Sequence, residues 1–445
     1  MLAPVALGTM LAPLNSTMIA VAIPSLLEDF DRSLAWGTWI VTSYLVAMAA
    51  VQPLGGALGD RYGRRRLFLI GLALFLVATV VAALSWRIEV LLVARTVQAI
   101  SGAAAIPNGT ALVHSLVPPE RRGRAFGNVG SAIALAAGLG PPVGGILTAA
   151  LGWRWIFAAN LLLLAPALVL GWRLPADGPA PRKGRFDLQG AALLTVGLVS
   201  LVLSITTWRL PGAPLFVAPA LGLAAAAAGF ALVRHAGRSP NPVLNLALLR
   251  ARGFTPAVAT VLLSNLTMYT LLLSLPLFLT AWSLWDSARI GLLLAALSLP
   301  TIVFAPLGGR LSDSLGRRAP TAIGMALITL GALPFLTVYP TWSWLLYTVP
   351  LVLIGAGLGL SMAPVQTTAV ETAPSSQAGQ ASGLFSTMRY LGSILGSSVM
   401  AAVLSGATPP VGSFRLLYAM LFLSACGATI AALRLPKWLD KASPR

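Results

Sequence analysis

A chain of 445 residues that is 57% hydrophobic, only 9% charged and has a mean hydropathy of +0.85 does not fit a soluble globular protein. Soluble domains carry about 25% charged residues. The apolar residues form long blocks separated by short segments rich in Arg, Gly and Pro, whereas a transmembrane β-barrel has short alternating strands. The composition therefore predicts an all-α polytopic membrane protein.

Fourteen apolar segments approach the length of about 20 residues that a membrane-spanning helix needs. In chain order they are 3–27, 38–59, 67–85, 89–112, 124–150, 155–172, 188–208, 213–234, 255–281, 288–311, 319–339, 343–370, 379–406 and 413–434. Because the number is even, both termini are expected on the same side. The first segment lacks a basic flank, so we expect a retained helix, with a short basic leader upstream of Met1 as one hypothesis.

Topology accounts for the net charge of +18. With the N-terminus in the cytoplasm, 22 of the 30 Lys and Arg residues fall in cytoplasmic segments and six in outer loops, and Arg95 and Arg389 lie within spans. This asymmetry follows the positive-inside rule. It predicts a multi-pass protein of the cytoplasmic (inner) membrane, with lipid neighbours and two cytoplasmic termini, and it removes the reason to expect a nucleic-acid partner.

Residues for metal, cofactor or covalent chemistry are scarce. The single cysteine, Cys426, lies in the last apolar segment, and His114 and His235 are expected to be surface residues in short loops. A membrane-embedded enzyme needs a nucleophile, base or metal cluster at depth, and no such group of Cys, His and acidic residues is present. We expect no metal, no cofactor and no enzymatic activity.

Two loops reveal an internal repeat. "GGALGDRYGRRRL" (55–67) follows the second segment, and "GGRLSDSLGRRAP" (308–320) follows the tenth. Repeated membrane halves indicate a transporter with its site between them. The spacing leaves room for two extra helices, which predicts six plus two plus six: an N-terminal bundle (1–173), linkers with two inserted spans (174–254), a C-terminal bundle (255–435) and a tail (436–445).

The chain resembles the major facilitator superfamily, and more narrowly its 14-spanner drug:proton antiporter branch. The resemblance covers nearly the whole chain and rests on five motifs in order: "GALGDRYGRRR" (56–66), "LLVARTVQAISGAA" (91–104), "GLGPPVGGIL" (138–147), "GWRWIFAAN" (152–160) and "GLFSTMRYLGSILG" (383–396). It implies the major facilitator fold and export of small molecules such as drugs or antibiotics. A lipid or metabolite carrier of the same fold is the alternative, and a monomer is expected.

The repeated loops are candidate gates. Asp60 lies four residues before Arg64, so one helical face can hold both. In the family this acid is thought to brace the two halves near the start of the thirteenth span, where "PSSQAG" (374–379) can favour an anion through its helix dipole. The alternative is a solvated, positively charged loop. The candidate gating residues are Gly56, Asp60, Gly63, Arg64, Gly309, Asp313 and Arg317.

The fifth segment carries small residues and prolines that favour close packing and a kink. Its exporter motif includes Gly140, Pro141, Gly144 and Gly145. These residues could serve packing alone, and the resemblance adds a bias toward export.

Polar residues away from the span ends are candidates for a central substrate cavity, because polar groups are costly at that depth. Each could instead make an ordinary interhelical hydrogen bond. The candidates are Asn15, Thr17, Tyr44, Gln52, Arg95, Gln98, Asn265, Tyr269 and Arg389.

Asn15 replaces the aspartate that this branch usually carries, and an amide does not bind a proton at physiological pH. Coupling could have moved to Glu89 or Asp60, the substrate could move without proton exchange, or the substrate could carry the protonatable group. With Arg95 and Arg389 but no deep acid, the cavity is expected to favour neutral or anionic amphipathic compounds.

Overall fold

The computed structural model describes residues 2–32, 34–175, 187–207, 214–239, 242–243, 245, 247–283, 285, 287–404 and 409–437. Within these residues the chain is helical and contains no strand. The helices are α1 (Ala3–Asp29), α2 (Leu34–Tyr62), α3 (Arg64–Ala83), α4 (Ile88–Leu116), α5 (Arg122–Leu151), α6 (Trp155–Gly171), α7 (Leu188–Thr207), α8 (Val217–Ala236), α9 (Ala247–Arg250), α10 (Phe254–Trp282), α11 (Ser287–Leu315), α12 (Arg318–Ala332), α13 (Trp344–Glu371), α14 (Ala378–Val403) and α15 (Val411–Leu433), with short 3-10 turns η1 (Pro119–Arg121), η2 (Pro334–Thr337) and η3 (Ser375–Gln377).

Each of the fourteen apolar segments coincides with one long helix. By length and hydropathy, ten described helices can cross a membrane, or twelve if the bent helices α1 and α5 each count as one span. Helix α6 has only 17 residues, and α14 is not among the twelve. The chain is thus a multi-pass helical membrane protein, while the number of fourteen spans stays a prediction.

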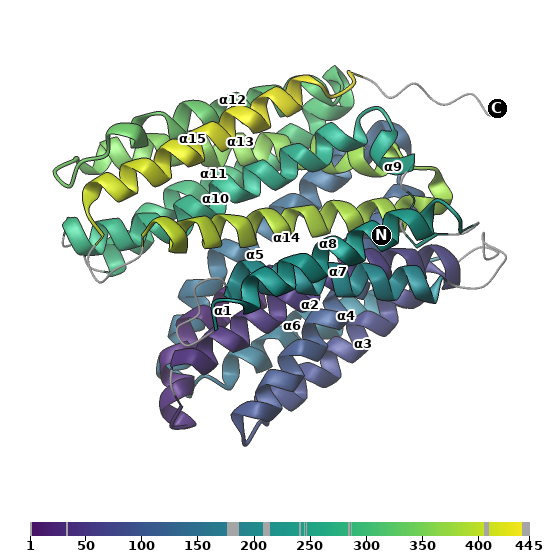
Figure 1. Cartoon of the computed structure of the whole chain (residues 1–445), viewed down its shortest axis with the longest axis horizontal. Helices are drawn as coiled ribbons and strands as arrows, with labels where there is room; N and C mark the ends of the chain where they lie inside the picture. Colours follow the sequence, from purple (N-terminus) through teal and green to yellow (C-terminus); the bar gives the residue numbers. More distant parts are fainter. Residues whose placement is uncertain are drawn as a thin grey trace.

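The helices form two groups (Figure 1), and each group has large buried apolar clusters. Helices α1–α4 and α6 are labelled in the lower part and α10–α13 and α15 in the upper part; α5 and α14 are labelled between them, and α7 and α8 lie in front. In the first group, Phe68 and Phe157 belong to two buried apolar clusters; in the second, Phe278, Phe335 and Tyr418 belong to one large cluster.

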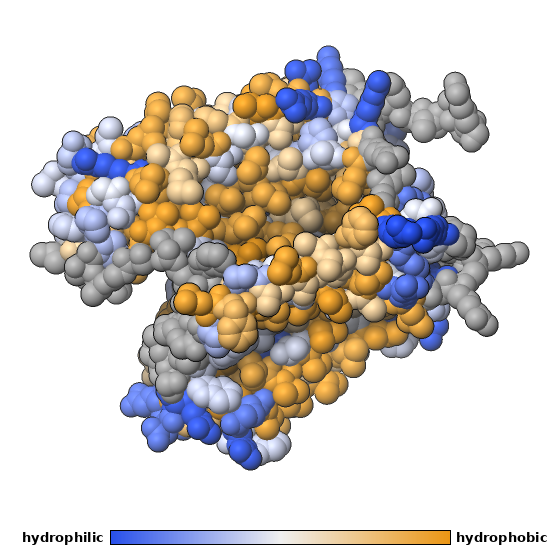
Figure 2. All heavy atoms as spheres, in the orientation of Figure 1, coloured by the Kyte–Doolittle hydropathy of each residue, from blue (hydrophilic) through white to orange (hydrophobic). Residues whose placement is uncertain are grey.

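The surface has the polarity of a membrane protein. Figure 2 shows an apolar belt between hydrophilic ends. Large apolar side chains are exposed, among them Leu162 and Leu223, at 77% and 74% of their surface. Exposed apolar area of this extent is suited to lipid rather than water.

The repeat has a structural counterpart at two tight turns. Gly63 joins α2 to α3 with φ 104°, and Gly316 joins α11 to α12 with φ 87°. Residues with a Cβ atom rarely adopt such angles. The repeated glycine therefore lets each helix reverse direction immediately after the repeated Asp, which positions the two candidate gates.

Candidate functional site

Asp60 connects the two helix groups. This buried carboxylate near the end of α2 accepts hydrogen bonds from the backbone N–H groups of Gly379 and Gln380, each at 2.9 Å, at the start of α14. Arg64 pairs with the same carboxylate at 2.9 Å and also donates to the carbonyl of Ser375. The acid thereby caps a helix N-terminus of the opposite group, where the helix dipole favours negative charge.

Asp313 makes the matching contact from the other group. It accepts hydrogen bonds at 2.8 Å from the backbone N–H groups of Gly123 and Arg124, at the start of α5. Arg317 pairs with Asp313 at 3.1 Å and with Glu371 at 3.1 Å. The two repeated loops thus join the halves through the same kind of contact.

Glu371, at the end of α13, was not predicted as a gating residue. It pairs with Arg317 and also lies 3.6 Å from the guanidinium of Arg122 in the other group. The sequence repeat carries no signal for it, because Arg64 of the first loop bonds a carbonyl instead of a second acid.

Glycines allow the close approach at both gates. A Cβ atom on Gly56 would lie 1.9 Å from the carbonyl oxygen of Gly379, and one on Gly309 would lie 2.2 Å from that of Gly123. Carbon–oxygen contacts this short are impossible, since nonbonded heavy atoms sit about 3.5 Å apart. The repeated glycines are therefore required for this closed arrangement.

A buried polar network lies deep within the first helix group. Gln98 Oε1 accepts hydrogen bonds from Asn15 Nδ2 at 3.1 Å and from Arg95 at 3.2 Å, while Gln98 Nε2 donates to Thr79 at 2.9 Å. The Arg95 guanidinium also lies 4.3 Å from the ring centre of Tyr44. All five side chains are buried. The sequence predicted four of them as candidate cavity residues. It gave no signal for Thr79, an uncharged residue within an otherwise apolar helix.

Arg95 has no acidic partner among the described residues, and its Nε atom has no hydrogen-bond partner there. The Asn15 Oδ1 and Tyr44 hydroxyl atoms, and both amide atoms of Gln52, are likewise buried without a described partner. Such groups normally find partners, since leaving them unpaired is costly. This region therefore offers free hydrogen-bonding capacity near a positive charge.

The second group is arranged differently. Asn265 donates to the carbonyl of Val261 on its own helix at 2.8 Å, whereas Asn15 bonds a different helix. Arg389 lies 5.6 Å from the ring centre of Tyr390 and interacts electrostatically with Tyr269. The similarity between the segments around Asn15 and Asn265 thus does not extend to the same contacts.

Helix α5 packs closely on α1 through the candidate exporter motif. A Cβ atom on Gly140 would overlap the Thr17 hydroxyl at 1.8 Å, and one on Gly144 would lie 2.9 Å from the Met18 Cα atom. A Cβ atom on Gly145 would meet only an ordinary contact at 3.7 Å. Helix α5 bends by 42° across Pro141, in agreement with the predicted kink. Thr17 thus lies against the α5 backbone.

Glu89 lies at the exposed start of α4, with 41% of its side chain accessible, and pairs with Arg32 and Arg87. Of the two acids considered for proton binding, only Asp60 is buried.

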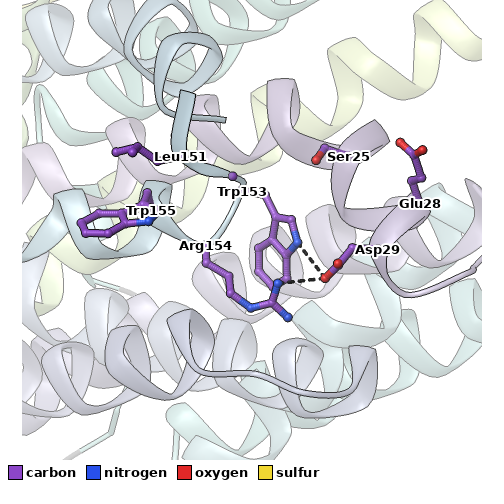
Figure 3. A pocket seen from close by; sticks show the side chains of 8 residues that line it. Ser25, Glu28, Asp29, Leu151, Trp153, Arg154 and Trp155 are labelled. Atoms are coloured by element: carbon purple, nitrogen blue, oxygen red, sulfur yellow. Dashed lines mark hydrogen bonds and ion pairs between the residues drawn. The ribbon is translucent and has the colours of Figure 1, made fainter. Parts of the chain in front are cut away.

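A pocket of about 440 Å³ opens beside the end of α1 and the α5–α6 turn (Figure 3). Inside it, Asp29 accepts hydrogen bonds from Trp153 at 3.1 Å and from Arg154 at 2.8 Å. Ser25, Glu28 and Trp155 complete much of its lining. None of its lining residues belongs to the buried network around Arg95.

The predicted loop position was wrong for both histidines, and the predicted surface position was wrong for His114, whereas His235 is partly exposed. His114 lies in the last turn of α4 and is buried, and His235 lies in the last turn of α8, 2.7 Å from Asp187. Both helices extend beyond the apolar segments from which they were predicted. A helix can continue past its apolar stretch where other helices pack on the extra turn.

Equivalent contacts join the two groups of helices at one end, and buried polar residues lie among the helices. This is the organisation of a secondary transporter. A family model described as Major Facilitator Superfamily matches residues 5–397. The chain belongs to this superfamily and is a transporter, not an enzyme.

Relatives and a solved structure agree with this assignment. The multidrug resistance protein Stp of Mycobacterium tuberculosis is 33% identical over 405 residues, covering 90% of this chain and 74% of the relative. The probable actinorhodin transporter of Streptomyces coelicolor is 33% identical over 410 residues, covering 88% and 70%. The crystal structure of the human organic anion transporter MFSD10 (TETRAN) superposes with a TM-score of 0.69 at 20% identity, covering 95% of this chain and 98% of that chain, which concerns the fold alone.

Proposed function

We propose that this protein is a secondary exporter of amphipathic small molecules, in which the two helix groups open alternately to either side of the membrane. The observation that carries the proposal is the pair of reciprocal contacts in which Asp60 and Asp313 each cap a helix of the opposite group. Such contacts can break and re-form as a unit, as alternating access requires. The printed names of two relatives, a multidrug resistance protein and an antibiotic transporter, support export.

The proposed architecture is six plus two plus six spans in the cytoplasmic membrane, with both termini in the cytoplasm. The arginine-rich turns from α2 to α3 and from α11 to α12 support this orientation, because positive loops remain inside. In this orientation the closed gates face the cytoplasm.

The proposed substrates are neutral or anionic. Arg95 is buried without an acidic partner among the described residues, and a second cation, Arg389, lies on α14. A site with this charge repels lipophilic cations, whose usual recognition needs a buried acid. An efflux panel in a pump-deficient host, comparing anionic, neutral and quaternary ammonium compounds, tests this proposal. High-affinity export of a quaternary ammonium dye would contradict it.

Proton coupling has two candidate forms. Asp60 is the buried acid that could exchange a proton as the gate opens. The amide at Asn15 instead favours a second candidate function, a carrier with no proton exchange. Proteoliposomes with clamped pH distinguish them: substrate efflux accompanied by proton counterflow supports an antiporter, and efflux without it supports the uncoupled carrier.

A further inference from the structure

Helices α7 and α8 cover the seam between the two groups. Val202 of α7 lies in one apolar cluster with Ala49 of α2 and with Leu391 and Ile394 of α14. Helix α7 thus contacts both sides of the seam at which Asp60 joins the groups, and α8 packs against α7 (Figure 1). Any separation of α2 from α14 has to change these contacts.

The pair is tied together by Asp187, directly before α7. Its carboxylate accepts hydrogen bonds from Gly190 N–H at 2.8 Å and Val243 N–H at 3.1 Å, and lies 2.7 Å from His235 Nε2. Burial alone would raise the pKa of Asp187, but these hydrogen bonds outweigh it and hold the pKa below its usual range. One ionised acid therefore joins the start of α7, the end of α8 and the segment that follows.

That segment continues to the gate. The Gln380 side chain donates to the Val243 carbonyl at 2.8 Å and to the Pro242 carbonyl at 3.3 Å. The backbone N–H of Gln380 donates to Asp60 at 2.9 Å. A second bridge runs beside the first, from Asn245 to Gln377 at 3.0 Å.

We propose that α7, α8 and the residues Pro242, Val243 and Asn245 form a clasp that holds the gate closed, with Gln380 as the positioning residue for Asp60. Gln380 is buried, and its side chain fixes the first turn of α14 to the inserted pair while its backbone binds the gate acid. When α14 leaves Asp60, the clasp has to release Gln380 or follow it. The inserted pair thereby sets the ratio of closed to open gates. This inference rests on the proposed alternating access.

Gln380→Met is the direct test, because Met has a similar size, keeps the backbone bond to Asp60 and removes only the bonds to the clasp. In a Cys426→Ser background, spin labels at Leu84→Cys and Leu333→Cys report the separation of the two groups at the end remote from the gate, where both native side chains are exposed. The gate-open state has the shorter remote-end distance. We expect Gln380→Met to raise the ratio of open to closed gates about ten- to hundredfold, as for the loss of two buried hydrogen bonds of about 1 kcal/mol each.

Ser204→Ala is the matched control. It removes a 2.7 Å hydrogen bond between α7 and α8 that has no link to Gln380, and should leave the distance distribution unchanged. Asp187→Asn should act in the same direction as Gln380→Met, which keeps the proposal testable if the latter does not fold. If both variants keep the distribution of the parent while the parent shows two distances, the clasp is refuted and alternating access stands. If the parent protein shows one fixed distance under all conditions, both the clasp and the proposed alternating access are refuted.

Discussion

Gly56→Ala should prevent the gate from closing. The new methyl carbon would lie 1.9 Å from the Gly379 carbonyl oxygen and 2.5 Å from its carbon, both backbone atoms of a helix start that cannot rotate away. A normal contact requires the helices to separate by about 1.5 Å. That movement takes the two Asp60 bonds, now 2.9 Å each, beyond hydrogen-bond range.

The expected cost follows from those two bonds. A hydrogen bond to a charged group contributes about 1.5–3 kcal/mol, so losing two disfavours closure by at least about 3 kcal/mol, or roughly 100-fold. The accessibility of position 111 reports this opening. Ala111 is buried beneath the gate in a cluster with Val370 and Ala378 from the other group. In a Cys426→Ser background, Ala111→Cys should react with a membrane-impermeant maleimide about 100-fold faster when Gly56→Ala is added.

Gly291→Ala is the control, since no heavy atom lies within 4 Å of the added methyl group. It should leave the labelling rate at Ala111→Cys unchanged. A folded Gly56→Ala protein with the labelling rate of its parent would refute the role assigned to the contact between Gly56 and Gly379.

Three further predictions concern buried polar groups. Arg95→Met should raise the free energy of unfolding by about 1–3 kcal/mol, because it removes a buried charge without an acidic partner among the described residues. It should also weaken export of anionic compounds. Thermal unfolding in detergent measures the first effect, and efflux assays measure the second. Asn15→Asp places a titratable group beside Gln98, so the pH profile of the export rate should change near neutrality relative to that of the parent, and identical pH profiles would contradict this. The lowered pKa of Asp187 means that its stabilisation is complete above pH 3.8 and lost as pH falls through the lower folded value; Asp187→Asn should abolish this loss in unfolding scans between about pH 2 and 6.

The helices and turns were predictable because local signals specify them. Long apolar stretches cannot expose backbone polar groups to lipid, so they form helices. The repeated glycines Gly63 and Gly316 mark turns for which other residues are poorly suited. The limits of the prediction lie at helix ends, as at His114, where packing rather than hydropathy decides how far a helix continues.

The partners of the polar residues were less predictable. The resemblance pointed Asp60 toward the start of α14, 319 residues further along the chain. No local sequence pattern predicts that Arg317 pairs with Glu371 or that Gln380 bonds Val243. Within its own segment, each of these polar groups looks ordinary.

By itself, the sequence determined the membrane environment, the helices, the internal repeat and the superfamily, since these depend on hydropathy and on motifs within short stretches. Only the tertiary structure decided that Asn15 bonds Gln98 while Asn265 bonds its own helix, and that the inserted helices reach the gate through Gln380. The physical reason is that a hydrogen bond depends on a separation of about 3 Å between two atoms. Such separations arise only when helices distant in the sequence pack together.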